Sequence, residues 1–217
     1  MDEYTKTTLT KLQSWFNELA ELPDLPNAHN LYTDKTSEGR TRLHNLKTYF
    51  AQSLPLHPTV LLVGEAPGYQ GTYRTGVNFC SEAQMLGPKN KFGIFGGTEA
   101  GYERVYPGDR IWKEPSSTVV WNLFETLPNI PLIWPAFPMH PHKPGVELSN
   151  RTPTPNELLV GAPIIRHLID IIQPKTVAAL GNIGYATLQV LNIEAVKVRH
   201  PAHGGAPLFR EQLVDLM

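Results

Sequence analysis

The first fifty residues contain two stretches in which apolar side chains recur at the three- and four-residue spacing of a helix. In such a pattern the apolar residues share one face, which buries against the rest of a domain. We therefore expect two helices, and we interpret residues 1–55 as an N-terminal helical extension packed on a single domain spanning 1–217. The repeating positions are Leu9, Leu12, Trp15, Phe16 and Leu19, then Leu43, Leu46, Tyr49 and Phe50.

Four short apolar runs further along have the composition of strands buried on both faces of a parallel sheet. They occupy 59–63, 130–133, 176–180 and 195–198. Helical segments separate them: one opens at Ser116 or Ser117 and ends at Leu127, one opens with a capping box of Thr154 and Glu157 and reaches about Ile172 through Pro163, one ends at Leu191, and one begins near Pro207. This alternation predicts a three-layer α/β/α fold with a four-stranded, mostly parallel sheet.

Composition narrows the class of protein. The 217 residues include a single cysteine, Cys80, which excludes a disulfide framework, a four-cysteine zinc site and a four-thiolate iron-sulfur cluster. The formal net charge of −1 gives no overall attraction to polyanions, so any nucleic-acid binding must come from a local patch. With no signal-peptide pattern and no long apolar run, we expect a monomeric, soluble cytoplasmic protein without a cofactor.

Ligands of such sheets bind at the carboxyl ends of the strands, which draws attention to the loops that follow them. The first strand is followed by Gly64-Glu65-Ala66-Pro67-Gly68, a stiff turn that presents a carboxylate. The last strand is followed by Arg199-His200-Pro201-Ala202-His203-Gly204-Gly205, in which a histidine could hydrogen-bond a leaving group. Taken alone, the first loop is also compatible with an ordinary strand-to-helix turn, and each histidine with a structural role.

A third segment, Arg74-Thr75-Gly76-Val77-Asn78-Phe79-Cys80-Ser81-Glu82, contains an aromatic residue among glycine and polar neighbours. Phe79 can be a core anchor or can stack on a planar ring.

Together these three segments resemble the uracil-DNA glycosylase superfamily. The first loop is similar to its water-activating motif, the second segment to its base-stacking segment, and Arg199-His200-Pro201-Ala202 to the His-Pro-Ser-type loop that enters DNA. Residues 150–154 with Glu157 also match a stretch found in related bacterial members. The resemblance runs from about Val60 to the C-terminus and implies hydrolysis of the N-glycosidic bond of a damaged base, usually uracil, flipped out of DNA.

The resemblance also implies residue roles. Glu65 would activate water, Glu82 is the alternative carboxylate, and His200 would stabilise the departing base. The implied base-binding residues are Gly64, Ala66, Pro67, Gly68, Phe79 and Pro135, and the implied DNA-binding residues are Lys143, Arg151, Arg199, Pro201, Ala202, His203, Gly204, Gly205 and Arg210.

The chain departs from the family pattern at four points. It lacks the cysteines of the cluster-bearing branch, and Ala202 replaces the serine of the usual loop. Gly68 stands where some uracil-specific members place a tyrosine that excludes a 5-methyl group. Pro135 stands where related proteins usually carry an asparagine that reads the base, and a proline offers neither amide group, unless Asn78, Asn122 or a backbone group compensates.

Two other classes of function remain open. A zinc hydrolase would use His140, His142, His200 and His203 as ligands, although no carboxylate lies beside them in the sequence. A nucleic-acid-binding protein with the glycosylase fold and little activity is suggested by Pro135. In either nucleic-acid role we expect Lys143, Arg151, Arg199 and Arg210 to face phosphates.

Overall fold

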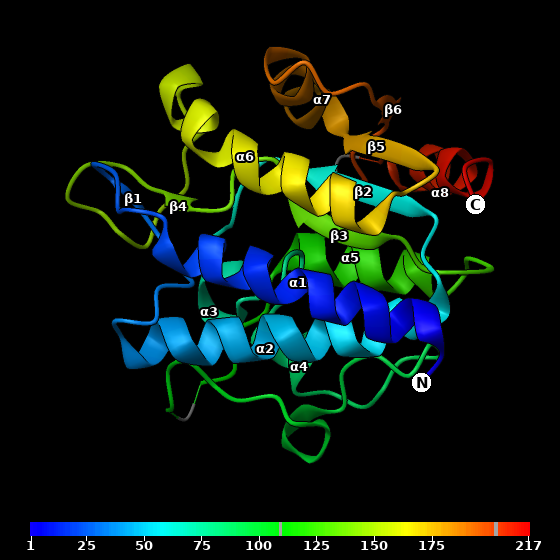
Figure 1. The fold of residues 1–217 in the computed structure, drawn as a ribbon, viewed down its shortest axis with the longest axis horizontal. Coiled ribbons are helices and arrows are strands. Elements are labelled where there is room, and N and C mark those ends of the chain that lie inside the picture. The colour runs from blue at the N-terminus through cyan, green and yellow to red at the C-terminus, as the bar shows by residue number, and fades with distance from the viewer. Residues whose placement is uncertain (109, 202–203) are drawn as a thin grey trace.

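The computed structural model describes residues 1–108, 110–201 and 204–217, and its centre is a four-stranded parallel sheet (Figure 1). The strand order is β3-β2-β5-β6, and every neighbouring pair is parallel. All five residues of β2 are buried, as the uninterrupted apolar composition predicts for a central strand. The strands are β2 (Val60–Gly64), β3 (Leu132–Pro135), β5 (Thr176–Leu180) and β6 (Val196–Val198).

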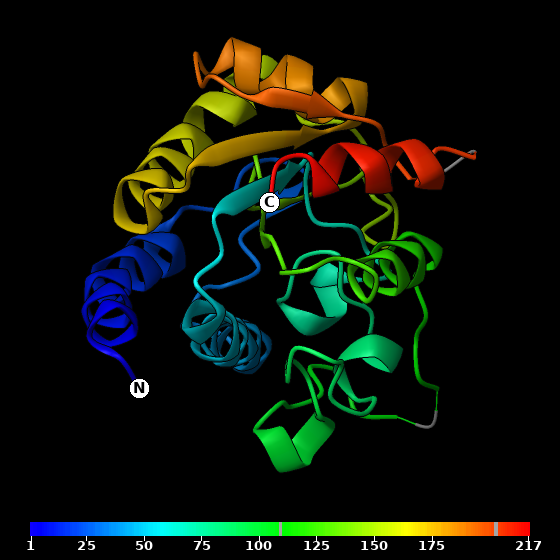
Figure 2. The ribbon, with the colours of Figure 1, turned by 90° about the vertical axis from the view of Figure 1, so that its right-hand side faces the viewer.

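Helices cover both faces of this sheet, which gives the three layers that the sequence predicted. Helices α1, α6 and α7 lie on one side, and α5 and α8 pack against each other on the other (Figure 2). Helix α2 runs beside α1 (Figure 1). Their bounds are α1 (Glu3–Glu21), α2 (Ser37–Ser53), α5 (Pro115–Phe124), α6 (Pro155–Ile172), α7 (Gly181–Val190) and α8 (Ala206–Val214).

Local signals placed α6 correctly and α5 less well. The capping box is present at α6: Thr154 accepts the backbone N–H of Glu157, and Glu157 accepts the backbone N–H of Thr154. At α5 the expected serine cap is wrong, because Glu114 is the N-cap residue and Pro115 opens the helix. Ser117 instead accepts the backbone N–H of Ser81, a contact that no local pattern encodes.

The N-terminal helices contribute to one continuous core. Trp15 of α1 is fully buried and meets Trp134 of β3 edge to face, with ring centroids 4.7 Å apart. Its indole N–H donates to the carbonyl of Ile164 in α6 at 2.9 Å. These contacts fasten α1 to both the sheet and α6.

Several short elements were not predicted. They are β1 (Ala28–His29), antiparallel to β4 (His140–Pro141), together with α3 (Thr72–Thr75), α4 (Glu82–Met85), η1 (Leu54–Leu56) and η2 (Gly97–Ala100). Segments this short carry too few residues for a period to be recognised. Within the described part of the chain, no helix combines the length and apolar character needed to cross a membrane.

Candidate active site

The four parallel strands bring four loops to one edge of the sheet. Gly64 at the end of β2 lies opposite Pro135 at the end of β3, and Leu180 lies opposite Val198. The residue after each of these strands is therefore delivered to the same edge.

A cavity of about 370 Å³ lies at this edge, a size typical of small-molecule sites. Three elements chosen from the sequence, the carboxylate of Glu65, the ring of Phe79 and the imidazole of His200, all line it. The structure thus brings together residues separated by more than one hundred positions in the chain. The remaining lining residues are Gly64, Ala66, Leu180, Gly181, Asn182, Ile183, Gly184 and Arg199.

Glu65 is held in a fixed loop and is poorly solvated. The backbone N–H groups of Ala136 and Phe137 donate to the carbonyls of Gly64 and Glu65 at 2.9 and 3.1 Å, which ties the loop to the end of β3. Burial raises the pKa of the Glu65 carboxyl, against a smaller lowering by a hydrogen bond with Thr152. Its Oε1 is buried and has no hydrogen-bond partner among the described residues. A carboxylate in this state is a stronger base than one in water.

Phe79 is held in an unusual backbone conformation. Its φ of 49° lies in the left-handed region, and its carbonyl accepts the indole N–H of Trp121 at 2.7 Å. A Cβ built on Gly64 would lie 2.6 Å from the Phe79 ring, so only glycine lets the ring approach β2 this closely. A backbone in this region costs on the order of 1 to 3 kcal/mol, and surrounding contacts such as the bond from Trp121 hold it in place.

Glycines also shape the surroundings of His200. Gly181 has a φ of 72°, and a Cβ there would lie 3.1 Å from the Cβ of His200. A Cβ on Gly205 would overlap the carbonyl oxygen of His200. The loop after β6 therefore packs closely over the first turn of α7, and His200 faces the cavity from the side opposite β3 in the strand order.

A recess of about 30 Å³ adjoins this cavity. Four residues line both spaces: Gly64, Glu65, Ala66 and Phe79. Pro135 and Gly68 lie here, together with Asn78, Thr72 and Glu114. Asn78 is thus one of the suggested replacements for the missing asparagine that reaches the site, whereas Asn122 is exposed on α5 and lines neither space. Pro67 lines a further pocket with Asn150 and Thr152, and Glu65 and Ala66 line this pocket as well as the cavity.

Glu82 lies outside both spaces. Its side chain is fully buried, pairs with Arg104 at 3.3 Å and accepts the backbone N–H of Trp112 at 3.0 Å. These two bonds attach α4 to the segment before α5. The geometry assigns Glu82 to this internal connection and leaves Glu65 as the carboxylate at the cavity.

The zinc alternative has no site in the described residues. The ring nitrogens of His140 each lie 2.9 Å from a backbone carbonyl, that of Pro67 or that of Glu147. Neither nitrogen is therefore turned toward a shared metal position, and His200 lies at the separate cavity. His203 lies outside the described residues. Across the described ranges, no three His, Cys, Asp or Glu side chains are grouped in a way that could hold a metal ion.

Arg151 was expected to face a phosphate, but its guanidinium is bound within the protein. Its guanidinium makes a two-pronged pair with Glu157, at 2.7 and 2.5 Å, and also donates to the carbonyls of His142, Thr152 and Asn27. With its donors used internally, Arg151 ties the loop before α6 to the start of that helix.

The other basic candidates do not form one patch. Arg199 is exposed at the cavity, Arg210 donates to the hydroxyl of Thr126 from α8, and Lys143 is exposed just after β4. Because β4 and α8 lie at opposite ends of the molecule, Lys143 and Arg210 cannot share a phosphate (Figure 1). In the loop that resembles the DNA-entering segment, Pro201 and Gly205 are buried and Gly204 is exposed, while Ala202 and His203 lie outside the described residues.

Sequence reasoning missed two parts of the site. Asn182 and Ile183, in the first turn of α7, line the cavity, and the rule that ranked the loop after β5 could have found them. Glu114 reaches the recess from the N-cap of α5. Only the Glu-Pro pair that precedes a helix marks it in the sequence.

Comparison with known proteins identifies the family of the chain and agrees with its fold. The model of the family described as "Uracil DNA glycosylase superfamily" matches residues 51–206, and the chain therefore belongs to that superfamily. The crystal structure of wild-type SMUG2 from Pedobacter heparinus is similar in fold, with a TM-score of 0.60 and 14% sequence identity over 96% of each chain. No curated protein matches the chain.

Proposed function

We propose that this chain is a DNA glycosylase that hydrolyses the N-glycosidic bond of uracil or another deaminated base flipped out of DNA. The observation that carries the proposal is the meeting of Glu65, Phe79 and His200 at one cavity. A base within a duplex is inaccessible to these groups, so the nucleotide must be extruded before they can act.

Phe79 supports the proposal as the surface on which the base stacks. Its ring lines both the cavity and the recess, and its close contact with Gly64 fixes its position. Stacking on an aromatic ring contributes about 1 to 3 kcal/mol per base and depends little on which base is stacked. Selection among bases must therefore come from polar groups around the ring.

Glu65 is suited to activate water. In the proposed reaction the water oxygen bonds to the sugar C1′ as the bond from C1′ to the base nitrogen breaks, and Glu65 accepts the water's proton. The bonding electron pair leaves with the base, which then takes up a proton. The raised pKa of Glu65 makes it a stronger base than a solvated carboxylate, and its charge offsets the positive charge that develops on the sugar.

His200 and the start of α7 are suited to the departing base. A hydrogen bond from His200 to the developing oxyanion lowers the activation barrier by on the order of 3 kcal/mol. Asn182 and Ile183 place the first turn of α7 at the same cavity, and the partial positive charge of a helix N-terminus also favours an anion.

Water, not an amine, is the proposed nucleophile. None of the described residues that line the cavity is a lysine, so no side-chain amine among them is placed to form a covalent link to the sugar. We therefore propose a monofunctional enzyme that leaves an abasic site in the strand. Arg199 at the cavity is the proposed contact to the DNA backbone, together with the following loop residues Pro201, Gly204 and Gly205.

A base-release assay tests this function. Single- and double-stranded oligonucleotides carrying uracil, hypoxanthine, xanthine or a thymine mismatch are incubated with the wild type, Glu65→Gln and His200→Ala. We expect release of at least one deaminated base by the wild type and a large loss in both variants. Binding to all the oligonucleotides without release of any base would contradict the proposal and favour a nucleic-acid-binding protein instead.

A further inference from the structure

Glu114 reaches the recess from an element that the catalytic roles do not involve. Its carboxyl group occupies the space beside two glycines that follow β2. A Cβ on Gly68 would lie 3.2 Å from Glu114 Oε1, and a Cβ on Gly71 would overlap Oε2. The absence of side chains at both positions is therefore what lets this carboxyl group enter.

The carboxyl group of Glu114 has no polar partner there. It makes no hydrogen bond or ion pair with any other described residue. Burial raises its pKa to about 7. The titratable groups near it are Glu65, across the recess, and Cys80, whose own pKa is raised first by burial and then by the charge of Glu114. Neither group supplies a compensating positive charge.

Asn78 is a second polar group in the recess; its amide nitrogen makes no hydrogen bond of good geometry, although its side chain interacts with the Tyr32 hydroxyl closely enough to lower that hydroxyl's pKa. The residue is 3% exposed, and its Nδ2 atom is buried without a partner among the described residues. The amide lies near the Tyr32 hydroxyl, where burial raises the hydroxyl's pKa and Arg42 and Asn78 partly offset that rise. The Tyr32 hydroxyl itself donates to the carbonyl of Gly76. The Asn78 amide nitrogen and the Glu114 carboxyl group line the same recess, and a ligand there could supply the complements of both.

We propose that Glu114 and Asn78 read the hydrogen-bonding edge of the extruded base. Glu114 accepts a ring N–H, and Asn78 donates to the carbonyl oxygen beside it. This inference rests on the proposed glycosylase function and names its substrate class: bases with a lactam edge, such as uracil and hypoxanthine. Pro135 lines the same recess and offers no polar side-chain atom, so the recognition that β3 lacks is supplied from α3–α4 and α5.

The two contacts explain how a deaminated base is distinguished from its parent. Deamination converts an unprotonated ring nitrogen into an N–H and the neighbouring amino group into a carbonyl. At that position the parent base would direct a lone pair at Glu114, and the two repel each other when the carboxyl group is ionised. The recess is small, about 30 Å³, so a methyl group on the ring nitrogen would compete with the Glu114 carboxyl group for the same space. Glu114 is thus a specificity-determining residue, while Glu65 remains the group that acts on water.

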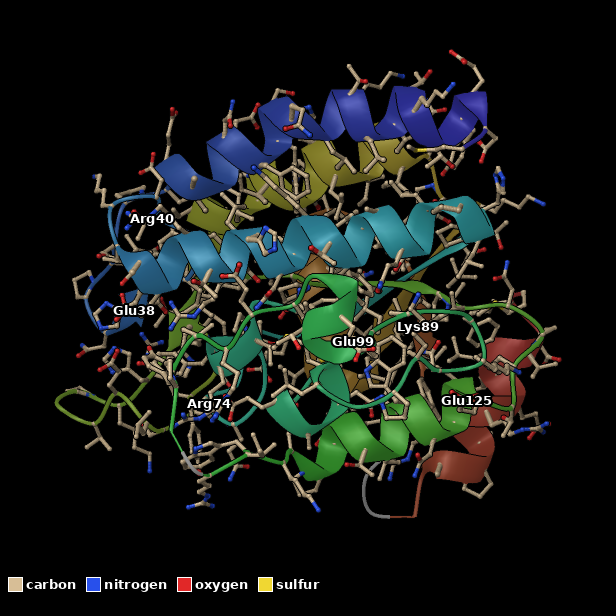
Figure 3. All side chains as sticks on the ribbon, turned by 90° about the horizontal axis from the view of Figure 1, so that it is seen from below. Glu38, Arg40, Arg74, Lys89, Glu99 and Glu125 are labelled. Carbon is tan, nitrogen blue, oxygen red and sulfur yellow. The ribbon has the colours of Figure 1, made fainter. Side chains whose placement is uncertain are left out.

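The test compares uracil with N3-methyluracil in single-stranded oligonucleotides, where no base pairing complicates extrusion. We expect the wild type to release uracil with a kcat/KM at least tenfold above that for N3-methyluracil. Glu114→Ala should lower kcat/KM for uracil at least tenfold and bring the preference close to unity, while Glu114→Gln keeps part of it. The matched control is Glu99→Gln, an exposed residue on η2, which should leave both values unchanged (Figure 3).

The outcomes separate this inference from the function beneath it. No release of any base by the wild type would overturn the proposed function. Equal release of uracil and N3-methyluracil by the wild type, or a preference unchanged in Glu114→Ala, would overturn the role of Glu114 while leaving the glycosylase intact. Urea unfolding shows whether each variant is folded, and Asn78→Ala, with the same expected tenfold loss on uracil, provides a second route if Glu114→Ala fails to fold.

Discussion

The cavity at the sheet edge and the segment from β4 to the start of α6 contain the same kinds of residue but use them differently. In the segment, the side-chain nitrogens of His140 and Arg151 form hydrogen bonds with backbone carbonyls and with Glu157. His142 Nε2 in that segment is also buried without a partner, but at the recess two such atoms, Glu65 Oε1 and Asn78 Nδ2, belong to residues that line one space. Leaving a buried polar group unpaired costs about 1 to 3 kcal/mol, so a fold that does so repeatedly in one place indicates a ligand site.

The largest expected effect comes from the cavity side. His200→Ala should lower the single-turnover rate of uracil release by about 100- to 1,000-fold, because it removes a donor to the departing base. Release of 5-fluorouracil should fall much less, because its anion is more stable and needs less help. The measurement is the ratio of the two rates in the wild type and the variant. A loss equal on both bases would mean that His200 does not act on the leaving group.

The next prediction concerns Glu114 in the recess and the free energy of unfolding of the protein. Burial raises the pKa of Glu114 to about 7, from an unfolded value near 4.5. A raised carboxyl pKa favours the folded state at low pH, and this advantage is lost as pH rises from about 4.5 to 7 and ionisation becomes costly. Glu114→Gln should therefore be more stable than the wild type at pH 8, by up to about 3 kcal/mol, and little different at pH 4.

Urea unfolding of the wild type, Glu114→Gln and Glu99→Gln at both pH values measures this difference. Glu65, whose pKa is also raised, stays in every variant and shifts all three proteins in the same direction. A stability gap between wild type and Glu114→Gln that is identical at pH 4 and pH 8 would show that Glu114 is solvated.

On the internally bonded side, Arg151→Ala should destabilise without changing DNA contacts. The substitution removes the partner of Glu157, whose pKa is held low chiefly by its hydrogen bond with Arg151. We expect a loss of about 1 to 3 kcal/mol in the free energy of unfolding. The salt dependence of oligonucleotide binding should stay as in the wild type, and a shallower dependence would return Arg151 to the phosphate-facing group.

The smallest effect separates two exposed cations. Arg199→Ala should reduce the slope of log binding constant against log salt concentration by about 1, as expected for one lost phosphate contact. Lys143→Ala, beyond the far end of β4, should leave the slope unchanged. Titrations of a fluorescent oligonucleotide at several salt concentrations provide the values. The reverse order for the two variants would place the DNA on the β4 side of the molecule.

The sequence predicted the fold and the main cavity because both depend on local or topological rules. Each strand appears as an apolar run, and the carboxyl-end rule brings Glu65 and His200 to one edge without any distance being known. The family resemblance supplied Phe79. The capping box of Thr154 and Glu157 was visible at its fixed spacing.

Two assignments, Glu82 and Arg151, differ from the structure because long-range partners decide where their side chains lie. Glu82 lies three residues after Phe79, yet Arg104 and Trp112 bind its carboxylate away from the cavity. Arg151 was predicted to face a phosphate, but in the structure its guanidinium pairs with Glu157. Glu114 gave no functional signal at all, because its position beside Gly68 and Gly71 exists only after α5 has packed against the loop.

The most direct test is single-turnover release of uracil from a single-stranded oligonucleotide at saturating protein, comparing the wild type with Glu65→Gln. The wild type should liberate the free base and leave an abasic site. Glu65→Gln should bind the oligonucleotide with wild-type affinity and release uracil at least 100-fold more slowly. Equal rates for the two proteins would show that the carboxylate at the cavity does not carry the chemistry.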